Sequence, residues 1–284
     1  MTILVTGTSG HLGRLVVESL LDRGVPARGV VATARDVETV SDLAARGVDV
    51  RRADYSDPTS LKEAFSGVDR ALLVSSNAIG KRVADHRNVI DAAADAGVNL
   101  LAYTSIANAD ATTLLLSADH QATEKILAAS GLPVVILRNG WYMENWAGQI
   151  TVALEHGALV GAAGEGRVSA ATRADYAAAA AAVLTLEDQA GRIYELGGSS
   201  FSLAELATEL SAQSGREVAY RDHSTSEYTA VLVDAGLPEA VAAIYADGDR
   251  GIRDGELLVE TGHLEQLIGR PSTPLADAIK AQLA

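Results

Sequence analysis

A glycine-rich segment near the amino terminus has the residue types and spacing of a phosphate-binding turn. It reads Thr6-Gly7-Thr8-Ser9-Gly10-His11-Leu12-Gly13 and lies between a short apolar run and an amphipathic stretch. In such turns the first glycine permits the tight bend, the second lets the backbone approach a diphosphate, and the third permits close packing of helix on sheet. The free N–H groups at the start of the following helix then face the anion. We expect a dinucleotide here, with a purely structural turn as the alternative.

The end of the second expected strand indicates which dinucleotide is bound. An acidic residue there would bind a ribose 2′-hydroxyl, whereas an arginine suits a 2′-phosphate. The strand ends with Ala32-Thr33-Ala34-Arg35-Asp36, so Arg35 directly follows the apolar run. This order favours NADP(H), and the alternative is a solvated Arg35 paired with Asp36. Asp54, after the third strand, is a candidate for contact with the adenine or for capping a turn ahead of Pro58.

The acid–base pair used by many dehydrogenases with this glycine pattern, Tyr-x-x-x-Lys, is absent. No lysine of the chain has a tyrosine four positions before it, which excludes that route of proton transfer. In the corresponding stretch, His120 and Glu124 share one face of an expected helix. The two residues are candidates for a proton relay, and a surface contact or a helix cap is the alternative.

Three aromatic residues follow the sixth expected strand, in a chain with only two tryptophans and two phenylalanines. They are Trp141, Tyr142 and Trp146. At the carboxyl end of a strand they would offer a flat apolar surface on which an aromatic electron acceptor could stack. Asn139, just before them, is able to bond a carbonyl oxygen or a nicotinamide amide. Packing between two lobes is the alternative role of both tryptophans.

A parallel sheet is needed to bring these segments together. Short β-branched runs alternate with amphipathic stretches in the first half of the chain, which is the rhythm of βαβ units. We expect strands at residues 2–6, 29–34, 48–52, 70–74, 100–104 and 134–137. With right-handed crossovers they form an α/β fold, a doubly wound parallel sheet of Rossmann type.

The rhythm changes after residue 139. A helix near residues 144–155, an alanine-rich helix at 175–186 and a strand at 193–196 follow, and the remainder is mostly helical with a short strand at 217–220. We therefore expect residues 1–140 to form the NADP(H)-binding domain. Residues 141–284 are expected to form a smaller, mostly helical, substrate-binding lobe packed against it.

The composition excludes several classes of protein. A formal net charge of -14 would repel a nucleic acid backbone. The chain has no cysteine, hence no disulfide and no thiolate metal site, which suits a reducing cytoplasm. No apolar run reaches the length of a membrane span, and the first strand begins too early for a signal peptide. We expect a cytoplasmic protein without a nucleic acid partner, membrane insertion or a bound metal.

The sequence resembles the atypical short-chain dehydrogenases of the NmrA-like group, in particular their bacterial quinone reductase and triphenylmethane reductase branch. The resemblance covers nearly the whole chain and includes the glycine-rich segment and Arg35. Further motifs that carry it include Ala53-Asp54-Tyr55, Leu73-Val74-Ser75-Ser76, His86-Arg87-Asn88-Val89-Ile90, Leu137-Arg138-Asn139-Gly140-Trp141-Tyr142 and Ala171-Thr172-Arg173-Ala174-Asp175-Tyr176. The last two are similar to the quinone reductase rather than to the dye reductase.

This resemblance implies a cofactor site and a reaction. NADP(H) would be held by the glycine-rich segment, Arg35, the strand end Ser75-Ser76-Asn77 and the loop Asn139-Gly140-Trp141-Tyr142-Met143-Glu144. NAD(H) stays possible because Asp36 and Glu38 are acidic. The reaction would pass hydride to a small-molecule quinone or similar aromatic acceptor, with neither metal nor flavin. An NADP(H)-binding redox sensor without turnover is the alternative; an isomerase or lyase is disfavoured because no acid and base pair is evident near the crevice.

Overall fold

The main sheet consists of seven parallel strands in the order β3-β2-β1-β4-β5-β6-β9. The computed structural model describes residues 1–78 and 80–283. The strands are β1 (Ile3–Val5), β2 (Val30–Ala34), β3 (Asp49–Arg52), β4 (Arg70–Leu73), β5 (Leu100–Ile106), β6 (Val134–Asn139) and β9 (Ile193–Leu196). The predicted doubly wound sheet is confirmed. The strand order reverses between β1 and β4, and ligands of such folds bind at the carboxyl ends of the strands at this point.

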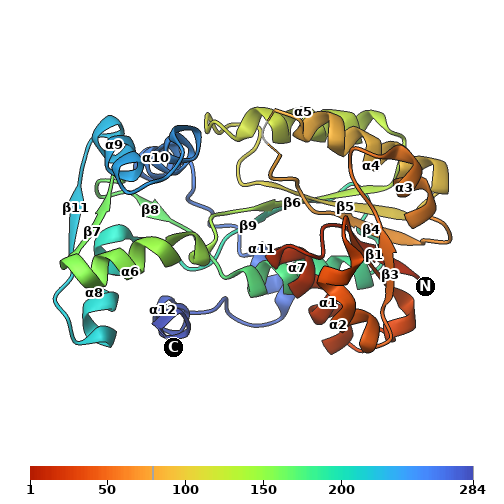
Figure 1. The fold of residues 1–284 in the computed structure, drawn as a ribbon, viewed down its shortest axis with the longest axis horizontal. Helices are drawn as coiled ribbons and strands as arrows, with labels where there is room; N and C mark the ends of the chain where they lie inside the picture. Colours follow the sequence, from red (N-terminus) through yellow and green to blue (C-terminus); the bar gives the residue numbers. More distant parts are fainter. Residues whose placement is uncertain (79, 284) are drawn as a thin grey trace.

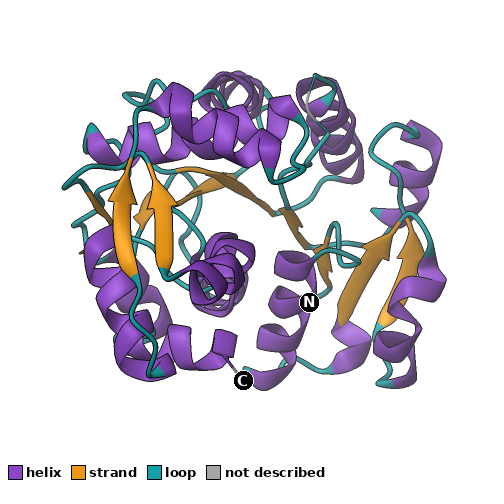
Figure 2. Cartoon of the chain, turned by 60° about the vertical axis from the view of Figure 1, so that its left-hand side comes forward, coloured by secondary structure: helices purple, strands orange, loops and turns teal. Residues whose placement is uncertain are grey.

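Helices enclose this sheet from both sides (Figures 1 and 2). One face is covered by α1 (His11–Asp22), α2 (Ser41–Ala45), α7 (Arg173–Thr185) and α11 (His263–Ile268). The other is covered by α3 (Pro58–Ala64), α4 (Arg82–Ala96) and α5 (Ser117–Ala129). Short 3₁₀ helices, η1 (Ala27–Gly29) and η2 (Val37–Val40), flank β2. Because both faces are covered, every residue of β1 and β2 is buried, which explains their continuous apolar runs.

A smaller lobe lies beside the sheet, on the left in Figure 1. Its strands form two pairs: β7 (Ala158–Gly161) with β11 (Ala219–Asp222), and β8 (Arg167–Val168) with β10 (Phe201–Ser202). Its helices are η3 (Met143–Trp146), α6 (Ala147–His156), α8 (Leu203–Ser214), α9 (Thr225–Asp234), α10 (Glu239–Arg253) and α12 (Leu275–Leu283). No helix in the described parts of the chain has the length and apolar character needed to cross a membrane.

The division of the chain differs from the expected boundary at residue 140. After η3, α6, β7 and β8 in the small lobe, the chain returns to the sheet half. There α7 packs beside α1, and β9 pairs in parallel with β6. Residues of both elements, such as Tyr176, Val183 and Leu196, are buried in the core beneath α1. The sheet half therefore includes residues 173–196 and α11, because their apolar side chains complete that face of the sheet.

A buried carboxylate anchors α7. Asp175 is fully buried and accepts hydrogen bonds from the Thr172 hydroxyl (2.8 Å), the Thr273 backbone N–H (2.9 Å) and Arg270 Nη2 (2.7 Å). These bonds lower the pKa of Asp175 against the opposing effect of its burial. The side chain thereby joins the start of α7 to the segment that leads to α12.

We predict that Asp175→Ala destabilises the protein by about 3 kcal/mol, because three donors lose their charged acceptor and the buried carboxylate leaves a cavity behind. Urea unfolding followed by circular dichroism measures the change. The matched control is Asp95→Ala on the exposed side of α4. An unfolding free energy of Asp175→Ala equal to that of the control would contradict the anchoring role.

Candidate active site

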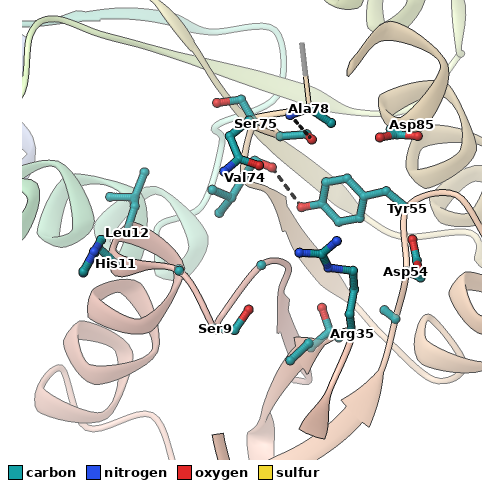
Figure 3. A pocket seen from close by; sticks show the side chains of 18 of the residues that line it. Ser9, His11, Leu12, Arg35, Asp54, Tyr55, Val74, Ser75, Ala78 and Asp85 are labelled. Carbon is teal, nitrogen blue, oxygen red and sulfur yellow. Dashed lines mark hydrogen bonds between the residues drawn. The ribbon is translucent and has the colours of Figure 1, made fainter. Parts of the chain in front are cut away.

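A cavity of about 490 Å³ opens at the carboxyl ends of β1, β2, β3 and β4. The strand ends and the start of α1 supply most of its wall, and Asp85 of α4 also faces it (Figure 3). Arg173, at the start of α7, completes the lining. The lining residues are Gly7, Ser9, Gly10, His11, Leu12, Gly13, Thr33, Ala34, Arg35, Ala53, Asp54, Tyr55, Val74, Ser75, Ser76, Asn77, Ala78, Asp85 and Arg173. Eleven of the residues expected at a cofactor site thus lie on one cavity: Gly7, Ser9, Gly10, His11, Leu12, Gly13, Arg35, Asp54, Ser75, Ser76 and Asn77.

The glycine turn leaves no room for side chains at its centre. A Cβ on Gly13 would lie 2.5 Å from the carbonyl oxygen of Gly7, and Gly7 itself has a φ of +63°. Helix α1 begins at His11 after the N-cap Gly10, which has no side chain to bond the first backbone N–H groups. These groups therefore stay available for an anion at the helix start. Thr8 is different: it is fully buried, and both its N–H and hydroxyl donate to the Thr33 carbonyl.

Arg35 extends into the cavity between Ser9 and Asp54 (Figure 3). The ion pairs and hydrogen bonds of residues 1–78 and 80–283 include none for its guanidinium. The alternative pairing with Asp36 is not present, because that carboxylate accepts the Glu38 N–H and caps η2 instead. Asp54 accepts the N–H and the hydroxyl of Ser56, and these bonds lower its pKa. Asp54 thus both caps a turn and lines the cavity.

Helix α4 holds the wall formed by Ser75–Ala78. The N–H of Ser76 donates to His86 Nε2 (2.9 Å), and Arg82 Nε donates to the Ser76 carbonyl (2.6 Å). His86 Nδ1 is hydrogen-bonded to the Thr123 hydroxyl (2.9 Å), which itself donates to a backbone carbonyl. His86 is fully buried, and its burial, together with the charge of Arg82, lowers its pKa to about 3. The neutral imidazole is therefore a fixed acceptor for the cavity wall.

His120 and Glu124 make separate contacts and do not form a relay with each other. His120 Nδ1 is hydrogen-bonded to the Tyr103 hydroxyl (2.7 Å), and burial lowers the His120 pKa to about 3. Glu124 accepts from Ser105 (2.6 Å) and from Arg138 Nε (3.0 Å) and Nη2 (2.8 Å). Neither residue lines the cavity. Both contribute to the packing of α5 on the sheet.

The aromatic segment after β6 does not line this cavity, but Tyr142 packs against Arg173, which does. The expectation that both indoles face the crevice is corrected for Trp146, which is 1% exposed and packs against Phe201 in the small-lobe core. Trp141 is only partly buried and rests on Gly248 and Tyr245. Asn139 Nδ2 donates to the Tyr142 hydroxyl (3.2 Å), while its buried Oδ1 has no partner in the described chain.

Three other residues expected near the cofactor have structural contacts. Gly140 donates its N–H to the Leu196 carbonyl, Met143 is buried in the small-lobe core, and Glu144 accepts the backbone N–H of Arg173.

Conversely, the cavity includes residues that were not expected there from the sequence, above all Tyr55, Asp85 and Arg173. Tyr55 donates to the Val74 carbonyl and Thr6 is bonded to its hydroxyl, so it joins three strand ends. No local signal pointed to Arg173, which precedes a helix expected at residues 175–186 in the small lobe; it reaches the cavity because α7 lies beside α1.

No group of three or more His, Cys, Asp or Glu side chains in the described ranges is arranged to hold a metal ion. The arrangement instead offers backbone donors and one unpaired arginine to an anionic, extended ligand. A dinucleotide has this character.

The NmrA-like family model matches residues 1–247. The chain belongs to the NmrA-like family. It is 46% identical to quinone oxidoreductase 2 of Escherichia coli over 98% of this chain and 97% of that protein. The crystal structure of the NADPH-dependent E. coli quinone oxidoreductase in complex with NADPH superposes with a TM-score of 0.97, at 45% identity and full coverage of both chains. Triphenylmethane reductase of Citrobacter sp. in complex with NADP(H) gives a TM-score of 0.94 at 39% identity, covering 99% of this chain and 100% of that one. The resemblance noted in the sequence is confirmed.

We predict that His86 makes the stability fall on acidification. The unfolded chain protonates His86 near pH 6.5, but the folded protein does so only near pH 3. Its stabilising contribution is complete above pH 6.5 and declines by about 1.4 kcal/mol for each pH unit below that. In His86→Gln, the amide oxygen still accepts the Ser76 N–H but does not titrate. Between pH 6 and pH 4.5, urea unfolding should show a shallower decline for this variant.

The control for this measurement is His156→Gln, a substitution at an exposed histidine of α6. It should keep the wild-type slope. Equal slopes for the wild type and His86→Gln would contradict the buried neutral state of His86.

Proposed function

We propose that this protein is an NADPH-dependent oxidoreductase that reduces a quinone or a similar flat aromatic acceptor. The observation that carries the proposal is the cavity in which the uncapped start of α1, the glycine turn and Arg35 come together. The 46% identity to quinone oxidoreductase 2, over nearly the whole of both chains, supports the same reaction class.

The lining residues fit a dinucleotide. The absence of Cβ atoms at Gly7 and Gly13 keeps the turn close to the helix start, where the free N–H groups would hold the diphosphate. Arg35, at the end of β2, would hold a 2′-phosphate. The wall Ser75–Asn77, fixed by His86, would lie along the remaining part of the cofactor. When bound, the reduced nicotinamide supplies a hydride.

The residues of this site favour an acceptor that needs no protein acid. Hydride and one proton convert a quinone into a hydroquinone, and water can deliver that proton to the oxygen. His120 is hydrogen-bonded to Tyr103 and Glu124 to Arg138, and neither lines the cavity, so neither is placed to donate a proton to a ligand there. The protein's part is then to bind, orient and exclude competing water. We assign the orientation of the acceptor to Asn139, Trp141 and Tyr142, with Trp146 supporting the Trp141 ring from the core at a centroid distance of 6.4 Å.

Arg35 is proposed to select NADPH over NADH. We predict that Arg35→Gln raises the dissociation constant of NADPH roughly 10- to 100-fold, the effect of losing a charge-assisted bond to phosphate. The affinity for NADH should stay unchanged. Fluorescence titration measures both constants, with the exposed Arg28→Gln as the matched control. Equal losses for the two dinucleotides, or no loss at all, would refute this role.

The reaction itself is tested with purified protein, NADPH or NADH, and a panel of quinones. We predict loss of reduced-nicotinamide absorbance that requires both the protein and a quinone. Tight dinucleotide binding without consumption for any quinone would overturn the proposal in favour of an NADP(H)-binding redox sensor.

A further inference from the structure

Arg173 is the one lining residue of the cavity that comes from α7, in the part of the chain that the structure describes. It is the first residue of α7, the helix that packs beside α1. Both helices cross the same face of the sheet, and both begin at its carboxyl edge (Figure 1). The Arg173 side chain therefore enters the cavity near the start of α1, whereas Arg35 enters it at the end of β2.

The guanidinium of Arg173 contacts the segment Tyr142–Asn145 and still has N–H donors without a partner in the described chain. Its Nη2 donates to Asn145 Oδ1 (3.0 Å), its Nη1 lies 3.9 Å from Glu144 Oε2, and its Cζ lies 5.2 Å from the centre of the Tyr142 ring. The Asn145 bond uses one of the five N–H donors that a guanidinium carries. The side chain is 22% exposed, so the remaining donors are only partly shielded from a ligand.

The two arginines of the cavity wall lie where different anionic groups of a dinucleotide would bind. The acidic lining residues Asp54 and Asp85, after β3 and on α4, lie on the opposite side of the cavity from His11 and Leu12 at the start of α1 (Figure 3). Arg35 lies beside Asp54 at the end of β2, where it would bind a 2′-phosphate. Arg173 is the cation on the α1 side, where the helix start offers N–H groups to a diphosphate.

We propose that Arg173 binds the cofactor diphosphate and, through the same guanidinium, positions the segment Tyr142–Asn145 next to the acceptor. This inference rests on the proposed function. Tyr142 lies beneath the guanidinium, and Glu144 also accepts the Arg173 backbone N–H at 2.9 Å. Occupation of the diphosphate site is thereby linked to the loop that carries the acceptor-facing aromatic residues.

Binding measurements with ligand fragments separate the two arginines. Arg173→Gln should raise the dissociation constants of NADPH and NADH by the same factor, about tenfold for one lost charge-assisted contact. The dissociation constant of 2′-AMP should not change, because this fragment lacks the diphosphate. Arg35→Gln should give the reverse pattern, with losses for NADPH and 2′-AMP but not for NADH. Arg173→Lys, which keeps the charge without the planar fork, should fall between the wild type and Arg173→Gln.

The matched control is Arg221→Gln, which removes one positive charge from the exposed edge of β11. Thermal unfolding of each variant reports whether its fold is intact. Wild-type affinity of Arg173→Gln for both dinucleotides would overturn the proposal, and so would an equal loss for 2′-AMP, which marks a general distortion of the cavity.

The binding and turnover measurements together separate a failure of the Arg173 assignment from a failure of the proposed quinone reduction. If the wild type binds dinucleotides and Arg173→Gln shows the selective loss, but no quinone is consumed, the Arg173 assignment stands and the reaction is refuted. If the wild type binds neither dinucleotide, both are refuted.

Discussion

The close approach of Gly13 to Gly7 is the constraint on which the site depends. With only 2.5 Å available between a Cβ at Gly13 and the Gly7 carbonyl oxygen, any other residue would push α1 away from the end of β1. At contact distance, the uncapped first turn of α1 points its N–H groups into the cavity formed by the neighbouring strand ends. Electrostatic attraction for a diphosphate follows from backbone geometry alone.

The remaining walls are held by buried polar contacts rather than by the ligand. His86 accepts the Ser76 N–H, Tyr55 bonds Val74, and Asn88 donates to the Tyr55 carbonyl. These bonds join α4 to two strand ends, and they pair the fully buried His86, which would be costly to leave without a partner. The neutral state of His86 is part of this arrangement, because a protonated ring could not accept the Ser76 N–H. A cavity preorganised in this way suits an enzyme whose work is to bind and orient.

Polar contacts also tie the small lobe to the sheet half. The loop between β5 and α5 reaches α10 and the segment after it: the Leu115 N–H donates to Asp247 (2.6 Å), and Thr112 and Thr113 both donate to Glu256. Leu114 enters the small-lobe core and contacts Gly251. The two lobes therefore meet through both packing and hydrogen bonds around the segment that carries Trp141. This arrangement gives the aromatic residues a fixed position relative to the cavity.

The sequence by itself determined the first six strands of the sheet, the glycine turn and the position of Arg35, because each depends on neighbouring residues and a regular period. Only the tertiary structure decided the environment of residues whose partners are distant in the chain. Trp146 is buried because Phe201 packs on it, and Arg173 reaches the cavity because α7 returns to lie beside α1. The same return places β9 next to β6 and moves the boundary between the lobes. Such contacts have no local sequence pattern, because they form between apolar surfaces of segments that are distant in the chain and meet only in the folded protein.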